Sequence, residues 1–156
     1  ILNYIGDIVS TLGRDDTYIL LILILWLSAF LSSSIDNIPI TKVLIPVVGE
    51  MPDIASESIR TQLFFGLSIG ANWGDNLTPL GDNILVVNIA EQNKRPISIN
   101  QFFRLGFFTT IYQLSIVTIY YTLLFKPELG LFIVLIITVI ISVFLVILKL
   151  GPRILR

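Results

Sequence analysis

The residues most able to do chemistry lie in two short polar segments, each of which carries a proline and interrupts a long apolar stretch. The first segment, 32–39, contains Asp36 and Asn37, and the second, 73–83, is rich in carboxyl, amide and hydroxyl groups. Oxygen atoms of these kinds are the ligands that hard cations prefer. Because the chain has no His and no Cys, thiol chemistry, histidine base catalysis and the usual zinc sites are excluded. We expect no cofactor and no metal other than a transported cation.

Acidic side chains within an apolar stretch must face protein or water rather than lipid. A lipid-facing acid costs about 2.5 to 3.5 kcal/mol on insertion scales, so three of them would cost roughly 8 to 10 kcal/mol. Interrupted helices also end with free carbonyl groups that attract cations and begin with free N–H groups that attract anions. The sequence therefore predicts an ion-binding site, in which three acids favour a cation or a proton. Its candidate residues are Ser34, Asp36, Asn37, Asn72, Asp75, Asn76, Thr78, Asp82 and Asn83.

Both polar segments can also be interpreted as ordinary turns outside a membrane, because Asn-Leu-Thr-Pro and Gly-Asp-Asn are favourable turn sequences. The apolar stretches beside the second segment, 63–72 and 84–91, are however each too short to cross a bilayer, which needs about 20 residues. Together, with the polar segment between them, they are long enough. This favours a broken transmembrane helix, whose non-helical middle is tolerated only inside protein or beside water.

The composition places these segments in a membrane. Of the residues, 54% are hydrophobic and only 13% charged, against about 25% charged in a globular domain. Charge is absent from 17–35, 105–125 and 129–148, stretches close to the length of about 20 residues that spans a bilayer. With ten basic and eleven acidic residues, the chain offers no electrostatic basis for a nucleic-acid partner. Its expected partner is the lipid bilayer.

These patterns predict an all-α polytopic membrane protein. Residues 17–51 are expected to form a re-entrant helical hairpin, although their length also fits a full span followed by a return. Ser98 is expected to be the N-cap of an interfacial turn. The predicted elements are an interfacial helix at 1–16, the hairpin at 17–51 with its tip at 32–39, a broken transmembrane helix at 61–92 with its break at 73–83, an interfacial turn and transmembrane helix at 96–125, and a transmembrane helix at 129–149.

The distribution of basic residues orients this layout. If 91–104 is cytoplasmic, the Lys and Arg residues at 94, 95, 104, 149, 153 and 156 lie inside, and only Arg60 and Lys126 lie in outside loops. Cytoplasmic loops carry an excess of Lys and Arg. We therefore expect a multi-pass protein of the plasma (inner) membrane with a cytoplasmic C-terminus and the 51–60 loop outside.

The polar segments and their surroundings resemble the ion transporter superfamily, which includes arsenite-pump permeases, a class of sodium/proton antiporters, and citrate and divalent-anion symporters. The resemblance is strongest to the arsenite-permease and sodium/proton-antiporter branch. It covers nearly the whole chain and rests on the Trp26-to-Ser32 stretch with Asp36-Asn37-Ile38-Pro39-Ile40-Thr41 and Ile45-Pro46, on Gly70-Ala71-Asn72-Trp73-Gly74-Asp75-Asn76-Leu77-Thr78-Pro79-Leu80-Gly81, and on Ile89-Ala90-Glu91 and Pro96-Ile97-Ser98.

This resemblance implies a fold of two inverted repeats, each with a re-entrant hairpin and an unwound helix whose tips enclose the substrate. The chain matches the second repeat, so we expect it to be the C-terminal half of a secondary active transporter whose N-terminal repeat is a further partner. A homodimer is also compatible with this fold. The implied function is cation/proton exchange or ion-coupled transport of Na⁺ or H⁺. An arsenite or dicarboxylate/citrate-type anion permease is the alternative.

Three positions depart from the pattern of the superfamily. Asp75 stands where relatives have the second Gly of Gly-Gly-Asn, Asp82 replaces a small residue, and Lys42 replaces a small or polar one. The two acids add negative charge near the expected site, which disfavours an oxyanion or citrate. Lys42 has two interpretations: it could stand in for a bound cation and couple a proton to ion binding, or it could simply extend to the membrane surface.

Two other classes of protein fit less well. A structural membrane subunit without transport would leave the polar segments unexplained. An intramembrane aspartyl protease would use two acids that share a proton, for which Gly81-Asp82 is suggestive, but Pro79 occupies the place where a glycine is expected. We therefore expect a protein that is not an enzyme.

Overall fold

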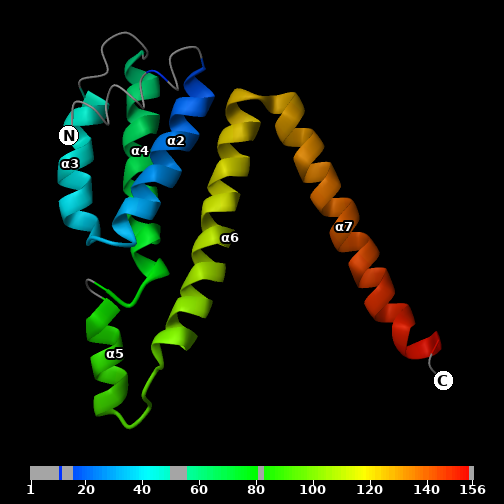
Figure 1. Ribbon diagram of the computed structural model, residues 1–156. Helices are drawn as coiled ribbons and strands as arrows, with labels where there is room; N and C mark the ends of the chain where they lie inside the picture. Colours follow the sequence, from blue (N-terminus) through cyan, green and yellow to red (C-terminus); the bar gives the residue numbers. More distant parts are fainter. Residues whose placement is uncertain (1–10, 12–15, 50–55, 81–82, 155–156) are drawn as a thin grey trace. The chain divides into compact units, whose positions relative to one another are not determined.

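The computed structural model describes residue 11 and residues 16–49, 56–80 and 83–154, with side chains as far as residue 147. Every regular element in these ranges is helical (Figure 1), which confirms the all-α prediction for this part of the chain. The chain divides into two compact units, Ile1–Val117 and Thr118–Arg156. The interfacial helix expected at 1–16 lies outside the described residues, apart from residues 11 and 16.

The first unit begins with two helices joined by a short connection, α2 (Thr17–Ser32) and α3 (Asn37–Gly49). Asp16 caps α2, because its Oδ1 accepts the Tyr18 N–H at 2.9 Å. Pro39 falls in the first turn of α3, where its missing N–H costs no helical hydrogen bond. The connection at 33–36 lies within the range predicted for the hairpin tip.

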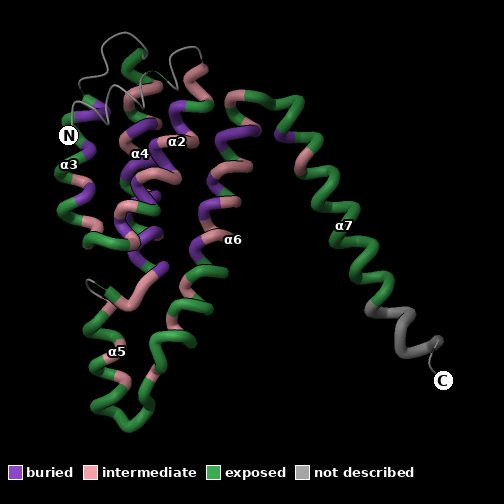
Figure 2. Tube along the Cα trace, in the orientation of Figure 1, coloured by how far each residue is buried: buried purple, intermediate pink, exposed green. Residues whose placement is uncertain are grey.

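Helix α4 (Glu57–Gly74) packs most extensively on α2 and less on α3. A Cβ added to Gly70 would collide with the Leu25 carbonyl oxygen and Ser28 Oγ, and one added to Gly74 would collide with the backbone of Ala29. The two helix backbones are therefore in direct contact, as small residues permit between membrane helices. Figure 2 shows the buried residues concentrated along this contact. The buried face of α4 consists of Leu63, Gly66, Leu67, Gly70, Ala71 and Gly74.

The helix is interrupted after α4, as the sequence indicated. A short 3-10 turn, η1 (Asp75–Leu77), follows at once, and α5 (Asn83–Gln92) resumes the helix. Helix α4 is longer than the apolar stretch 63–72, because it begins at Glu57 and has 18 residues. An acid in the first turn is favourable beside the positive end of the helix dipole, so polar residues that the sequence analysis assigned to a loop extend this helix.

The turn after α5 explains how the chain leaves it. Lys94 has a φ of 58°, and its N–H donates to the Glu91 carbonyl while the Arg95 N–H donates to the Ala90 carbonyl, both at 2.9 Å. This is the Schellman pattern of helix ends, here with lysine in the position that usually holds glycine.

Helix α6 (Ile99–Phe125) begins with the predicted N-cap. The Ser98 Oγ accepts the Gln101 N–H and the Gln101 Oε1 accepts the Ser98 N–H, both at 3.2 Å, which is a reciprocal capping box. The prediction for Ser98 is therefore confirmed. The helix starts before the charge-free stretch at 105–125, so the expected interfacial turn is part of the helix itself.

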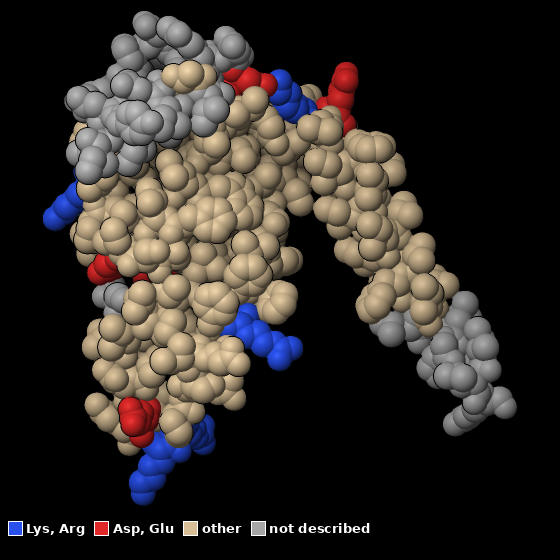
Figure 3. Space-filling view, in the orientation of Figure 1, with Lys and Arg blue, Asp and Glu red and all other residues tan. Residues whose placement is uncertain are grey.

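Helix α7 (Pro127–Ile154) is separated from α6 by Lys126 alone. It begins earlier and ends later than the predicted span 129–149, because Pro127 is well suited to the first helical position. Ile99–Phe125 and Pro127–Ile147 are long and apolar enough to cross a membrane, with mean hydropathies of 1.3 and 3.3. Only 6% of the second stretch is buried, and Figure 3 shows an almost uncharged surface along the described part of α7. Such a surface fits contact with lipid.

Candidate functional site

The structure brings the two predicted polar segments together. The Thr78 hydroxyl after η1 donates to the Ser33 carbonyl in the α2–α3 connection at 2.6 Å. At the preceding residue, the buried Ser32 hydroxyl donates to the Ala71 carbonyl of α4, also at 2.6 Å. Residues far apart in the sequence are thus tied by side chains that satisfy main-chain carbonyls, so the connection and the interruption of the helix lie side by side.

The carbonyl groups of the interruption already accept hydrogen bonds. The Asn83 side-chain amide donates to the carbonyls of Asp75 at 2.9 Å and of Thr78 at 3.3 Å. The Thr110 hydroxyl of α6 donates to the Trp73 carbonyl at 3.2 Å. A carbonyl oxygen has a second lone pair, but these bonds hold the main chain in a fixed path. Of the expected ligands, these main-chain carbonyls are therefore already engaged by side-chain donors.

Two side-chain oxygens at the α2–α3 connection lack donors. Asp36 Oδ1 and Asn37 Oδ1 are buried atoms that accept no hydrogen bond from any described residue. A buried acceptor left unsatisfied costs about 1 to 3 kcal/mol. A bound cation is the kind of partner that would remove this cost, since it is satisfied by carboxylate and amide oxygens.

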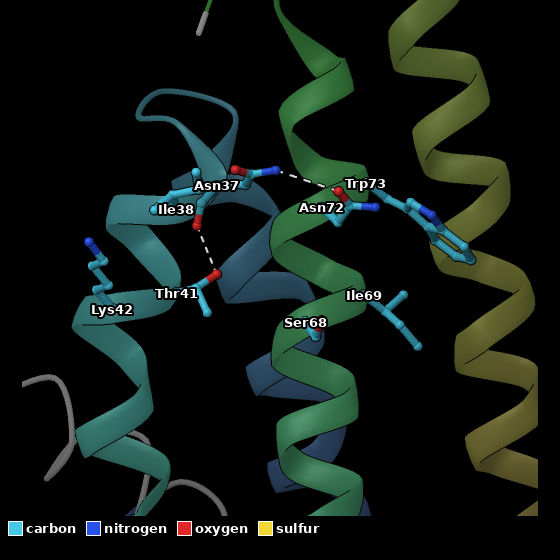
Figure 4. A pocket seen from close by; sticks show the side chains of 8 residues that line it. All are labelled: Asn37, Ile38, Thr41, Lys42, Ser68, Ile69, Asn72 and Trp73. Carbon is cyan, nitrogen blue, oxygen red and sulfur yellow. Dashed lines mark hydrogen bonds between the residues drawn. The ribbon is translucent and has the colours of Figure 1, made fainter. Parts of the chain in front are cut away.

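A hydrogen bond links Asn37 to α4. Its Nδ2 donates to Asn72 Oδ1 at 3.5 Å, a long bond that Figure 4 shows bridging the two helices. A cavity of about 400 Å³ lies beside this bond, and Figure 4 shows the side chains that line it. No acid lines this cavity, which is bounded by Asn37, Ile38, Thr41, Lys42, Ser68, Ile69, Asn72 and Trp73.

The remaining predicted residues differ in their environments. Asp75 is buried, with 7% of its surface exposed. Thr78 and Asn83 are partly buried and serve as donors in the bonds described above, whereas Ser34, Asn72 and Asn76 are exposed. Asp82 lies outside the described residues. Among those that are described, no three His, Cys, Asp or Glu side chains gather into a metal site.

Lys42 is exposed on α3. In Figure 4 its side chain extends away from α4, although its stem borders the cavity. The geometry described here thus brings Lys42 near Asn37 and Thr41 rather than to an acid of the interrupted helix.

The sequence analysis missed the residues that hold the site together. Gly66, Gly70 and Gly74 recur at every fourth position, and this spacing of small residues is a recognisable signal for close helix packing in membranes. A matching group of small residues, Ser28, Ala29 and Ser32, lies on α2. Thr110 carried no such signal, because its partner at Trp73 is remote in the sequence.

Comparison with known proteins identifies relatives of this chain. It is 32% identical over 126 residues to the "46 kDa membrane protein" of Mycobacterium leprae, a match that covers 77% of the chain. It is 34% identical over 117 residues to the "P protein" of Mus musculus, covering 69% of the chain. A protein of Mycobacterium tuberculosis named as an uncharacterized transporter is 35% identical over 101 residues, or 63% of the chain.

The chain is homologous to these membrane proteins. The resemblance to the ion transporter superfamily is thereby confirmed over part of the chain. The match spans only 29% of the M. leprae protein, 14% of the mouse P protein and 24% of the M. tuberculosis protein. No protein-family model matches the chain, and no solved structure matches it significantly. The names of the M. leprae and M. tuberculosis relatives describe a membrane protein and a transporter rather than enzymes.

Proposed function

We propose that this chain is part of a secondary active transporter that moves a small cation, Na⁺ or H⁺, across the membrane. The observation that carries the proposal is the pair of buried, donor-free oxygens, Asp36 Oδ1 and Asn37 Oδ1. They lie at the connection that Thr78 ties to the interruption of the α4–α5 helix. The name of the M. tuberculosis relative, a transporter, supports the same function.

In this proposal the cation binds at the α2–α3 connection. Asp36 supplies the negative charge and Asn37 supplies a neutral oxygen. The buried Asp75 belongs to η1, directly before Thr78, which contacts Ser33 of the connection. Asn83 fixes the path of the main chain rather than binding the ion, because its amide is engaged with two carbonyls. One carboxylate that binds either a proton or a cation gives exchange of the two without a further coupling ion.

The membrane layout belongs to the same proposal. Helices α2 and α3 form a re-entrant hairpin that enters from outside, and α4 and α5 form one broken span. Helices α6 and α7 cross fully, with the C-terminus in the cytoplasm of a cell whose plasma (inner) membrane holds the protein. The chain acts with an N-terminal repeat that completes the site, and the whole transporter can pair as a homodimer.

An anion is the alternative substrate, either arsenite or a dicarboxylate such as citrate. It is supported by the cavity between α3 and α4, which is lined by two amides and one lysine and by no acid. Amide and ammonium groups donate hydrogen bonds to anions. The acids at the adjacent connection oppose this choice, since they would repel a negative substrate.

Flux through the full-length protein in sealed vesicles tests the proposal. Asp36→Asn keeps the shape of the side chain and removes its charge, so proton-gradient-driven Na⁺ uptake should fall about tenfold or more, as expected when a buried charged ligand is lost at a cost of a few kcal/mol. Glu128→Gln, at the exposed start of α7, is the matched control and should transport normally. Wild-type flux in Asp36→Asn would reject the cation site, and uptake of arsenite or citrate by the wild type in place of Na⁺ would establish the anion alternative.

A further inference from the structure

The side of α4 opposite its glycine face carries a polar stripe. Its exposed residues recur at helical intervals, so they lie along one side of the helix from its first turn to the interruption. Phe65 is the one apolar residue among the exposed residues of α4, and the polar ones are Glu57, Ser58, Thr61, Ser68 and Asn72. The exposed Asn76 of η1 follows them in the chain. A helix packed against lipid on that side would carry apolar residues there instead.

Helix α3 faces part of this stripe with polar groups of its own. Asn37 and Thr41 line the cavity from the α3 side, and Ser68 and Asn72 line it from the α4 side (Figure 4). Pro46 lies within α3 and has no N–H, so the Lys42 carbonyl lacks its usual helical donor. The exposed Lys42 ammonium and this carbonyl both require water or protein rather than hydrocarbon.

The contacts of α4 with α2 and α6 leave less open volume than its contact with α3. Against α2, Gly70 and Gly74 bring the two backbones into direct contact. Toward α6, Thr110 bonds to the Trp73 carbonyl, and a Cβ on Gly106 would collide with the Asn76 carbonyl oxygen. Of the contacts that α4 makes with described helices, the one with α3 is therefore the one that combines polar lining with an open volume of about 400 Å³.

We propose that the groove between α3 and α4 is a water-filled path along which the ion reaches the α2–α3 connection. This inference rests on the proposed function. The path follows Ser68 and Thr41 to the Asn37–Asn72 hydrogen bond, whose length of 3.5 Å marks it as weak. Beside that bond lies Asn37 Oδ1, and Asp36 Oδ1 belongs to the preceding residue; both are buried and donor-free in the described structure. An arriving cation would thus meet the Asn37 and Asn72 amides before the carboxylate.

Cysteine labelling tests the path directly, since the chain has no cysteine of its own. The full-length protein, made cysteine-free elsewhere, would carry Ser68→Cys and be exposed in vesicles to a cationic methanethiosulfonate reagent. Ser142→Cys is the matched control, because Ser142 is also exposed but lies on the apolar helix α7. Labelling should be about tenfold faster at Ser68→Cys, because the thiolate that attacks the reagent and expels its sulfinate forms in water and not in hydrocarbon.

Two further variants complete the experiment. Thr41→Cys, on the opposite wall of the cavity, should also react fast and replaces Ser68→Cys if that variant fails to fold. Ser28→Cys, which is fully buried against α4, should react slowly. Equal rates at Ser68→Cys, Thr41→Cys and Ser142→Cys would overturn the path.

The path and the proposed function fail in distinguishable ways. Labelling of a folded protein does not depend on transport, whereas the effect of Asp36→Asn on flux does not depend on the groove. Labelled Ser68→Cys should lose about tenfold in Na⁺ flux while labelled Ser142→Cys keeps it, because a bulky group would fill the path. Fast labelling of Ser68→Cys without loss of flux would reject the groove as the route of the ion, even if Asp36→Asn abolishes transport.

Discussion

Helix α4 meets the two helices before it in different ways. Its α2 side is made of glycine, alanine and leucine, and the backbones touch. Its α3 side is polar, leaves a cavity and is bridged by the long Asn37–Asn72 hydrogen bond. Helix α4 thus packs rigidly against α2 on one side and leaves space for an ion beside α3 on another side. The periodicity of the sequence assigns each residue type to its side.

The largest expected effect is on the glycine side. Gly74→Ala places a methyl group against the Ala29 backbone, which cannot move as a flexible side chain can. Overpacking of this kind costs about 1 to 3 kcal/mol and occasionally more. The thermal midpoint of the purified full-length protein should therefore fall by several degrees. Gly49→Ala is the control, since nothing lies within 4 Å of the added Cβ; equal midpoints for the two variants would show that the α2–α4 backbones are not in contact.

A smaller effect is expected where Asn83 holds the interruption. Asn83→Ala removes two donors from the carbonyls of Asp75 and Thr78, a loss of about 1 to 3 kcal/mol. We expect Na⁺ flux to fall about tenfold, because the main chain at the site is no longer fixed. Asn93→Ala is the control, as the Asn93 amide donates locally, to the Ile89 carbonyl one turn earlier at the end of α5. Unchanged flux in Asn83→Ala would argue that the interruption holds its shape without this side chain.

Thr78→Val should have a more modest effect, because it removes one hydroxyl while it nearly keeps the volume. The lost bond joins the interruption to Ser33, and a single hydrogen bond contributes about 0.5 to 1.5 kcal/mol. The concentration of Na⁺ that gives half-maximal flux should rise about threefold to tenfold. Thr138→Val, which affects a bond within α7, should leave this concentration unchanged. A normal Na⁺ dependence in Thr78→Val would show that the two polar segments do not act together in Na⁺ binding.

The smallest effect is expected for Lys42→Gln. The side chain extends away from α4 in Figure 4, so its charge should not control proton exchange at the site. We expect the pH dependence of Na⁺ flux in vesicles to match that of the wild type. A flattened pH profile would instead establish Lys42 as the group that couples the proton to ion binding.

Much of the helical layout could be predicted from the sequence, and the reasons are local. Charge-free runs marked α6 and α7, Pro39 marked the start of α3, and Ser98 with Gln101 formed a capping box. Helix ends were less well predicted, because charged residues such as Glu57 and Arg104 are tolerated in the first turns of a helix. The polarity of the side chains therefore indicates where a helix ends less precisely than their hydrophobicity indicates where its middle lies.

The residue types of the candidate site could be predicted from the sequence, but the role of each residue could not. Sequence placed Asp36, Asn83 and Thr78 in one group of oxygen-bearing residues. It could not tell that Asn83 and Thr78 donate to main-chain carbonyls while Asp36 Oδ1 has no donor among the described residues. These differences arise from contacts between segments remote in the sequence, which no local pattern encodes.

Proton release on ion binding tests the central claim most directly. If Na⁺ and a proton compete for Asp36 as proposed, addition of Na⁺ to the purified full-length protein in weakly buffered solution should release protons. Asp36→Asn should abolish this release, while Glu128→Gln should retain it. A wild-type protein that releases no proton when Na⁺ is added, or an Asp36→Asn variant that releases as many as the wild type, would contradict the proposed site.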